Sequence, residues 1–346
     1  MWHRLLHASI IGALALLTAG NALAHGVTLD LRHPLPADSA FHTQFLQPWV
    51  DKVQKASGGR LHFHVHAADK DSAPATLFDQ VKEAKADVVW TALCYTPERF
   101  SALEVFELPL LTKNTLGASR AMWEYVRMSD AAQNELDGVR LLAIHQAGPA
   151  VFHMRNKSIA KADDLKGLKI GAATPAARRF LAHAGATPVD LPYGSAKSLS
   201  ATELDGALLG WESAPYLAGN LSAKFHSELA SPAARLDAPV FVLLMNAGTY
   251  KSLPDDLKKL IQDHSGADTI TALVKAFEDS AKGARQAAAD RGEAINAIPA
   301  EEVAKWQSAV QAATNEWIKS ADKRGASGKE LVEAAKEALQ AFDKAD

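Results

Sequence analysis

The sequence has 346 residues, more than one hydrophobic core usually supports, so we expect two lobes. Its formal net charge is −3, and its basic and acidic residues are interleaved as on solvated helix faces, so we expect no nucleic-acid partner. Cys94 is the single cysteine, which excludes a disulfide within the chain. Stability must therefore come from an ordinary hydrophobic core.

The first 24 residues have the pattern of an export signal. A basic residue, Arg4, precedes the apolar run 10–17, and Ala22 and Ala24 supply the small residues of a cleavage site. This run is well short of the roughly 20 residues that span a bilayer. Without a cysteine at the cleavage site, a bacterial lipid anchor is not expected. We predict cleavage after Ala24 and a freely diffusing periplasmic protein that begins at His25.

Strands and helices alternate through the first half of the predicted fold. In chain order we expect a strand at 27–31, a helix at 39–55, a strand at 60–66, a helix at 77–85, a buried strand at 86–91, helical structure at 118–137 and a strand at 139–145. The helix at 39–55 has Phe41, Phe45, Trp49 and Val53 on one face, because they are spaced by four. This order favours an open, largely parallel sheet covered by helices.

The second half predicts a similar unit and then a helical tail. We expect a strand at 168–172, a helix at 176–184 stopped by Gly185, an extended piece at 189–191 and a returning apolar strand at 240–245. Ser252 is expected to cap a helix, and the rest of the chain reads as almost pure helix that braces the lobes. The fold class is α/β with two discontinuous lobes: 25–148 plus 237–265, and 149–236 plus 266–346.

Five segments together resemble a known family. They are residues 41–63 (FHTQFLQPWVDKVQKASGGRLHF), 86–111 (ADVVWTALCYTPERFSALEVFELPLL), DDLKGLKI with AGATPV at 163–189, 203–212 (ELDGALLGWE) and 241–266 (FVLLMNAGTYKSLPDDLKKLIQDHSG). In order and spacing the chain is similar, from about residue 29 to 339, to the periplasmic solute-binding subunit of tripartite ATP-independent periplasmic (TRAP) transporters, of the C4-dicarboxylate-binding type. The resemblance implies a two-lobed periplasmic binding protein with open, mainly parallel sheets, a long lobe-spanning helix, ligand capture between the lobes and delivery to membrane permease subunits.

One position departs from that family. Its members usually carry an arginine directly after the GLKI strand, where the guanidinium holds a substrate carboxylate through two parallel hydrogen bonds. Gly171 occupies this position here, and Val151 stands where some relatives have a second arginine. Arg178 and Arg179, a few residues further on, are the candidates to replace it. The alternative is that both lie on an exposed helix face.

Small ligands of α/β units usually lie at the carboxyl ends of the strands, so the loops after residues 170 and 208 are the expected contacts. The candidate substrate-binding residues are Tyr95, Phe152, Gly171, Thr174, Arg178, Arg179, Tyr193, Trp211 and Glu212. Trp211 offers a flat apolar surface, and Glu212 accepts hydrogen bonds. In the alternative, Trp211 packs between the lobes and Glu212 caps a turn, and Tyr95, Phe152 and Tyr193 are core. Cys94 is read as a buried thiol.

A second hypothesis makes the protein a metal scavenger. His62, His64 and His66 alternate along a strand and so share one face. Strand neighbours two apart are separated by nearly 7 Å along the chain, so three in a row converge poorly on one ion. A solvated strand face is the alternative, and no metal or other cofactor is expected.

No nucleophile elbow, phosphate loop, dinucleotide turn or zinc helix motif is present, so we do not expect an enzyme. The favoured function is capture of a small organic solute by a monomeric binding protein. Loss of the usual arginine leaves two ligand classes open: a carboxylate held by Arg178 or Arg179, or a neutral or cationic solute facing Glu212. Aromatic residues around the cleft favour a monocarboxylate with an apolar or aromatic body.

Overall fold

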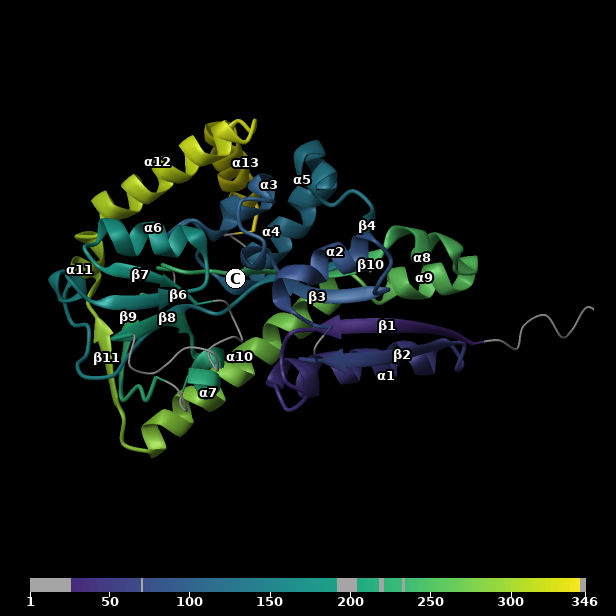
Figure 1. Cartoon of the computed structure of the whole chain (residues 1–346), viewed down its shortest axis with the longest axis horizontal. Coiled ribbons are helices and arrows are strands. Elements are labelled where there is room, and N and C mark those ends of the chain that lie inside the picture. Colours follow the sequence, from purple (N-terminus) through teal and green to yellow (C-terminus); the bar gives the residue numbers. More distant parts are fainter. Residues whose placement is uncertain (1–25, 70, 192–203, 218–220, 232–233, 343–346) are drawn as a thin grey trace, which may run out of the picture.

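The computed structural model describes residues 26–69, 71–191, 204–217, 221–231 and 234–342. Two mixed β-sheets lie at opposite ends of the elongated molecule, each covered by helices (Figure 1). The first sheet has the order β2 (Leu61–Ala67), β1 (Val27–His33), β3 (Val88–Ala92), β10 (Val240–Asn246) and β4 (Val139–Gln146). The second has the order β11 (Ala294–Ile298), β9 (Phe225–Leu229), β5 (Ala150–Met154), β8 (Gly206–Gly210), β6 (Lys169–Ala172) and β7 (Thr187–Asp190).

Each sheet is parallel except for one strand. In the first sheet, β10 pairs antiparallel with β3 and β4, while β1, β2 and β3 pair in parallel. In the second sheet, β5 is the exception, since it pairs antiparallel with β8 and β9. Both exceptions are strands that the chain enters on crossing between the sheets. All other strands therefore direct their carboxyl ends toward the space between the lobes, which is where α/β proteins bind ligands.

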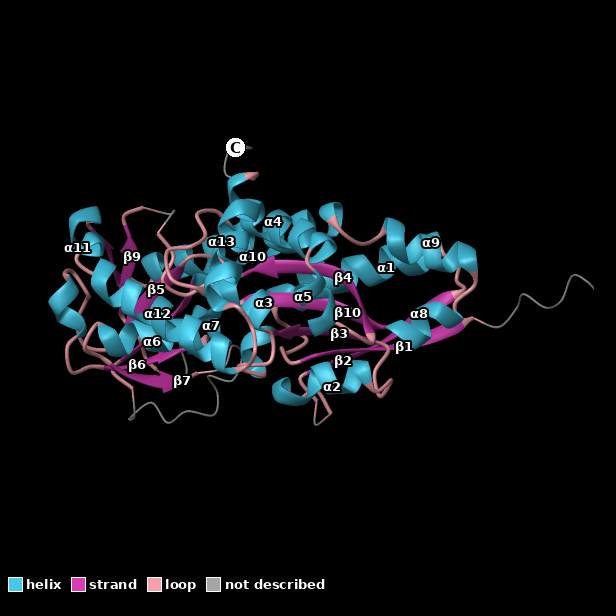
Figure 2. Cartoon of the chain, turned by 90° about the horizontal axis from the view of Figure 1, so that it is seen from above, coloured by secondary structure: helices cyan, strands magenta, loops and turns pink. Residues whose placement is uncertain are grey.

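Helices cover both sheets (Figure 2). Those packed around the first are α1 (Gln47–Ala56), α2 (Leu77–Lys82), α3 (Ser101–Glu104), α4 (Thr115–Met128), α5 (Asp130–Glu135), α8 (Ala247–Ser252) and α9 (Asp255–Asp263), and those of the second are α6 (Pro175–His183), α7 (Ala214–Leu217) and α11 (Ala300–Ala304). A π-helical turn (Phe41–Leu46) leads into α1. Phe41, Phe45, Trp49 and Val53 are all buried, as their spacing predicts.

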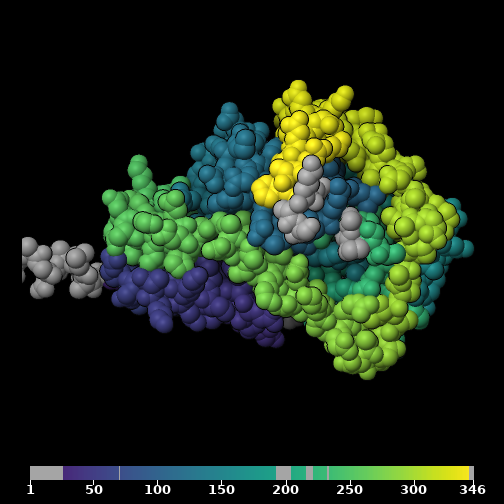
Figure 3. Space-filling view, turned by 180° about the vertical axis from the view of Figure 1, so that it is seen from behind, coloured from purple at the N-terminus to yellow at the C-terminus, as the bar shows by residue number. Residues whose placement is uncertain are grey.

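A single long helix joins the lobes. Helix α10 (Ala267–Asp290) packs Leu273 and Phe277 into the core beside the first sheet. Two turns further on, its small residues Ala284 and Ala288 pack against Val151 of the second sheet. Seen from behind, α10 runs across the molecule between the two ends (Figure 3). The lobe-spanning helix implied by the family resemblance is therefore confirmed.

The C-terminal helices brace the lobes from the other side. Helix α12 (Gln307–Lys323) packs on α6 of the second lobe, and α13 (Gly328–Gln340) packs on α4 of the first. Ala313 of α12 belongs to the core of the second lobe, whereas Trp317, one turn later, belongs to the core of the first. The tail thus crosses from one lobe to the other, as Figure 1 shows at its top.

Two details of the C-terminal half differ from expectation. The tail is not purely helical, because β11 interrupts it and pairs in parallel with β9. Ser252 does not cap a helix: it ends α8, and its hydroxyl donates to the carbonyl of Thr249, while α9 begins after Pro254. None of the described helices combines the length and the apolarity that a membrane crossing requires.

Candidate functional site

The ends of the strands bring the two lobes into contact. Cys94 and Tyr95 form a 3₁₀ turn directly after β3, and both side chains are buried. One hydrophobic cluster joins these residues to Ala173, at the end of β6, and to Leu209 of β8. Burial raises the pKa of the Cys94 thiol well above its usual value, which makes it an inert packing residue, as predicted. The strand ends of the two lobes thus pack against each other in one buried cluster.

Arg178 reaches back from the first turns of α6 to the end of β6. Its Nη1 atom donates to the carbonyls of Ala172 and Ala173, at 3.1 and 2.8 Å, and to Asp190 Oδ1 at 2.6 Å. Every side-chain hydrogen bond that Arg178 makes with the described residues uses this one nitrogen. Within the described part of the chain, Nε and Nη2 have no partner, and together they form the pair of parallel donors that a carboxylate accepts. The guanidinium stands at the strand end where Gly171 lacks a side chain.

Arg235 is a second cation near the cleft, and the sequence reasoning missed it. It lies in the segment that returns to β10 and is 3 % exposed. Its Nη1 donates to the carbonyl of Ala147 at 3.2 Å, and its Nη2 donates to Thr115 Oγ1 at 2.7 Å. Burial lowers the pKa of Arg235 to about 10, so it stays charged at neutral pH. Because both terminal nitrogens are engaged, Arg235 ties the crossing segments together.

Glu212 follows β8 in a 3₁₀ turn (Trp211–Ser213) and faces the crossing segment. It is 5 % exposed, and neither carboxylate oxygen has a hydrogen-bond partner among the described residues. Burial raises the pKa of Glu212 to about 7. Its carboxyl group lies against Gly148, where an added Cβ would be 3.3 Å from Oε2. Glu212 is thus a buried acid without a hydrogen-bond partner among the described residues; the charge of Arg235 partly offsets the effect of burial, and the acid is half neutral near pH 7.

An aromatic wall stands beside Glu212. Trp90 stacks between Phe41 and Phe241, with ring centroids 3.9 and 4.6 Å away. Phe277 of α10 meets this stack edge-on at Phe41. Phe41, Phe277 and Glu212 line one small cavity, together with Leu35, Ala40, Ala276 and Ser280. The cavity is therefore apolar and aromatic, with a single carboxyl group on its wall.

The remaining predicted residues lie elsewhere. Trp211 points away from Glu212 toward β9, where its indole nitrogen donates to Glu228 Oε1 at 2.7 Å. Phe152 is fully buried in the core of the second lobe. Thr174 caps α6 and donates to Asp237 Oδ1 at 2.7 Å. Arg179 faces Glu98 and Glu316 at the surface contact between lobes. Tyr193 lies outside the described residues.

Gly171 lies in a position that leaves no room for a side chain. A Cβ added there would be 2.7 Å from Leu191 Cδ2 and 3.2 Å from Leu204 Cδ1. We expect Gly171→Ala and Gly171→Arg to lower the free energy of unfolding by about 1–3 kcal/mol, through overpacking, in urea denaturation. Gly283→Ala is the matched control, because nothing lies within 4 Å of its added Cβ. Equal stability of the wild type and the Gly171 variants would contradict this packing.

Glu212 predicts a pH dependence of stability. Since its folded pKa of about 7 is raised above the ordinary value of 4.5, its favourable contribution is complete below pH 4.5 and is lost as pH rises through 7. The loss is roughly 3 kcal/mol by pH 8. We expect Glu212→Gln to be more stable than the wild type at pH 8 and similar at pH 4.5, measured by urea denaturation. A stability difference independent of pH would contradict the raised pKa.

Two lobes, joined by crossing strands and one long helix around a cleft, define the class of two-lobed ligand-binding proteins. Residues 31–320 match the family model of bacterial extracellular solute-binding proteins, family 7. The chain belongs to this family and is a TRAP-type solute-binding protein, as the sequence resemblance implied.

Solved structures of TRAP solute-binding proteins agree with this assignment, and a transporter protein is also similar in sequence. A TRAP solute-binding protein from Rhodoferax ferrireducens T118, in complex with copurified benzoate, is 35 % identical, with a TM-score of 0.86 and coverage of 92 % of this chain and 99 % of that one. A marine metagenome TRAP protein specific for aromatic acid ligands, with 3-hydroxybenzoate, is 32 % identical, with a TM-score of 0.86 and coverage of 93 % and 100 %. The outer membrane transporter protein TsaT of Comamonas testosteroni is 24 % identical over 330 residues, which are 95 % of this chain and 96 % of that protein.

Proposed function

We propose that the protein captures a monocarboxylate with an aromatic body between its lobes and delivers it to the membrane permease subunits of a TRAP transporter. The observation that carries the proposal is Arg178, whose Nη1 is held by Ala172, Ala173 and Asp190 while Nε and Nη2 have no partner among the described residues. A guanidinium whose Nη1 is fixed by hydrogen bonds is preorganised, so that Nε and Nη2 can hold a carboxylate by two parallel hydrogen bonds. Arg178 would then bind the carboxylate in place of the arginine that the family resemblance implies at position 171.

The rest of the cleft suits an aromatic body. Phe41 and Phe277 line the small cavity beside Glu212, and Trp90 and Phe241 lie buried behind Phe41 in the same aromatic stack. Aromatic rings favour stacked or edge-to-face neighbours over aliphatic ones of equal area. Two relatives more than 30 % identical hold benzoate and 3-hydroxybenzoate, which are aromatic monocarboxylates. Neutral Glu212 would donate a hydrogen bond to such a ligand, and ionised Glu212 would accept one from a ring hydroxyl.

Export and transport complete the proposal. The chain would lose residues 1–24 and act in the periplasm as a monomer, without catalysis, with lobes 25–148 plus 237–265 and 149–236 plus 266–346. Closure of the lobes around the ligand is the change that a permease would recognise. The comparisons favour an organic acid over a metal as the cargo, because the matched family and structures are solute-binding proteins.

A thermal-shift screen tests this function. The mature protein is unfolded and refolded to remove carried-over ligand, then heated with aromatic acids, sugar acids, amino alcohols or neutral sugars. Because a ligand that binds only the folded state stabilises it in proportion to the logarithm of its concentration over Kd, benzoate or 3-hydroxybenzoate should raise Tm progressively. Stabilisation by amino alcohols or neutral sugars alone would overturn the carboxylate proposal.

A further inference from the structure

A cluster of potential metal ligands lies on the outer face of the first sheet, on its edge pair of strands. Asp30 of β1 stands directly opposite His64 of β2, and Arg32 stands opposite His66, in the parallel register. Leu29 and Leu31 of β1 point into the core, so Asp30 between them points outward. The histidines alternate in the same way with Phe63 and Val65, which pack against the core.

One atom from each of Asp30, His64 and His66 lies within 4.8 Å of the other two. Asp30 Oδ1 is 3.3 Å from His66 Nε2 and 3.8 Å from His64 Nδ1. Tetrahedral zinc with ligand bonds near 2.0–2.1 Å places its ligand atoms about 3.3 Å apart. The distance from Asp30 to His66 already fits this geometry. The distance from Asp30 to His64 would shorten enough through a small rotation of the His64 side chain, which is 77 % exposed. We propose that Asp30, His64 and His66 bind a zinc ion, with water completing the coordination.

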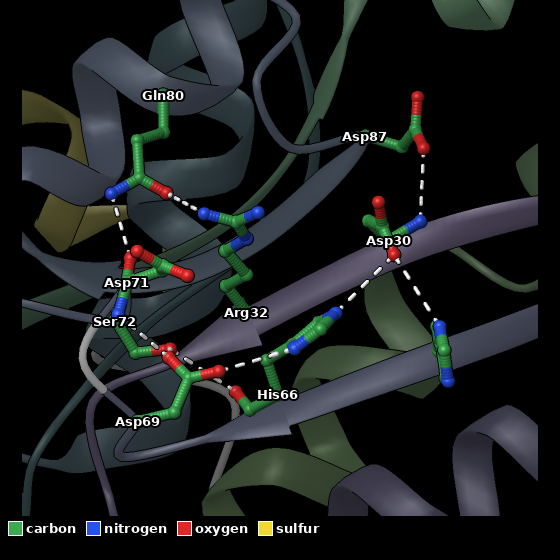
Figure 4. Close-up of polar contacts among 9 residues, drawn as sticks. Asp30, Arg32, His66, Asp69, Asp71, Ser72, Gln80 and Asp87 are labelled. Carbon is green, nitrogen blue, oxygen red and sulfur yellow. Dashed lines mark hydrogen bonds and ion pairs between the residues drawn. The ribbon is translucent and has the colours of Figure 1, made fainter.

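A neighbouring carboxylate supports this geometry. His66 contacts Asp30 through Nε2 and Asp69 through Nδ1, the latter at 3.1 Å, so the ring lies between two carboxylates (Figure 4). Asp69 is itself held by Ser72 Oγ at 2.7 Å and by the backbone N–H of Asp71 at 3.0 Å. A histidine that donates its second N–H to a carboxylate is the usual arrangement around protein-bound zinc. Asp69 thus fixes the ring so that Nε2 faces the ion.

The surroundings also favour a cation. Asp30 is anchored at its backbone N–H, which donates to Asp87 Oδ2 at 2.9 Å. Arg32, on the same face of β1, turns toward Gln80, to which its Nη1 donates at 2.7 Å (Figure 4). The ligand set of two imidazoles and one carboxylate carries a charge of about −1 when the histidines are neutral, which suits a divalent ion. This site is separate from the cleft and does not depend on the proposed transport function.

The residues that the structure brings together differ from the three histidines that the sequence suggested. The alternation selects His62, His64 and His66, but the third ligand comes from the neighbouring strand as Asp30. Residues opposite each other on paired strands lie closer than residues two apart on one strand. His62, exposed on the same face one step earlier, is therefore the matched control for the site.

Isothermal titration of the tag-free mature protein with Zn²⁺ at pH 7.5 tests the proposal. We expect one ion per chain and a higher Tm with Zn²⁺. His66→Ala and Asp30→Asn should lose at least tenfold in affinity, Asp69→Asn about tenfold, and His62→Ala should match the wild type.

Two outcomes would overturn the site. One is a wild type that binds no Zn²⁺ in the titration. The other is a His62→Ala variant that loses as much affinity as His66→Ala, which would place the ion on the histidine row instead of between the strands. Thermal shifts by benzoate, measured on the same His66→Ala variant, are expected to equal those of the wild type, because the zinc ligands lie outside the cleft. A loss of that benzoate shift would contradict the separation of the two sites.

Discussion

Replacing Arg178 by glutamine is expected to weaken the binding of an aromatic carboxylate by at least about 100-fold. Each hydrogen bond to a charged group contributes roughly 1.5–3 kcal/mol, and the variant removes two of them together with the charge. Arg178→Lys keeps the charge but not the planar pair of donors, so we expect an intermediate affinity. Titration calorimetry of refolded, ligand-free protein measures the three affinities.

Arg179→Gln is the control for this prediction. Arg179 follows Arg178 in the sequence, but its guanidinium faces Glu98 and Glu316 at 3.5 and 3.4 Å, away from the end of β6. Exposed pairs of this kind contribute little, so the affinity for ligand should change less than threefold. Melting temperatures of both variants show whether either fold is disturbed. An Arg178→Gln variant that binds benzoate as tightly as the wild type would remove Arg178 from the site.

Replacing Trp211 by alanine is expected to lower the free energy of unfolding by about 3–5 kcal/mol. The indole is 6 % exposed, packs edge-on against His153 with centroids 5.1 Å apart, and lies in one cluster with Ala288 of α10. Its loss leaves a cavity where α10 meets the second lobe, and it leaves Glu228 without one of its donors. Urea denaturation of ligand-free protein measures the change.

The comparison that decides the role of Trp211 is between stability and affinity. Trp211→Phe retains most of the apolar volume and should recover much of the lost stability. Both variants, titrated at a temperature where they are folded, should bind benzoate with nearly the affinity of the wild type. A large loss of affinity with unchanged stability would instead place the indole against the ligand, as the sequence analysis proposed.

The helices and strands with clear periodicity were predictable from the sequence. The spacing of four between Phe41, Phe45, Trp49 and Val53 fixes a buried helical face, and β1, β3, β4 and β10 form where apolar runs predict them. Strand β9 (FHSEL) was missed because polar and apolar residues are mixed in it, and β11 (AINAI) because it lies between two helices in a stretch that otherwise predicts helix. These two strands are stabilised by pairing with each other, which is a tertiary contact that the sequence pattern does not reveal.

The candidate site was only partly predictable, because the direction of a side chain depends on tertiary packing. Trp211 and Glu212 are adjacent in sequence, yet their side chains point to opposite sides of the turn, toward Glu228 and toward Gly148. Arg235 lies in a short segment between two strands, and nothing in RLDAP distinguishes it from a surface arginine. Likewise, Asp30 joins His64 only through strand register, which the sequence alone does not give.

The central claim is that the cleft recognises a carboxylate on an aromatic ring. The most direct test is calorimetric titration of the refolded mature protein with benzoate and, in parallel, with benzamide, which has the same shape but no charge. We expect benzoate to bind and benzamide to bind at least 100-fold more weakly, because two charge-assisted hydrogen bonds to Arg178 are lost. Equal affinity for the two compounds, or binding of benzamide alone, would contradict it.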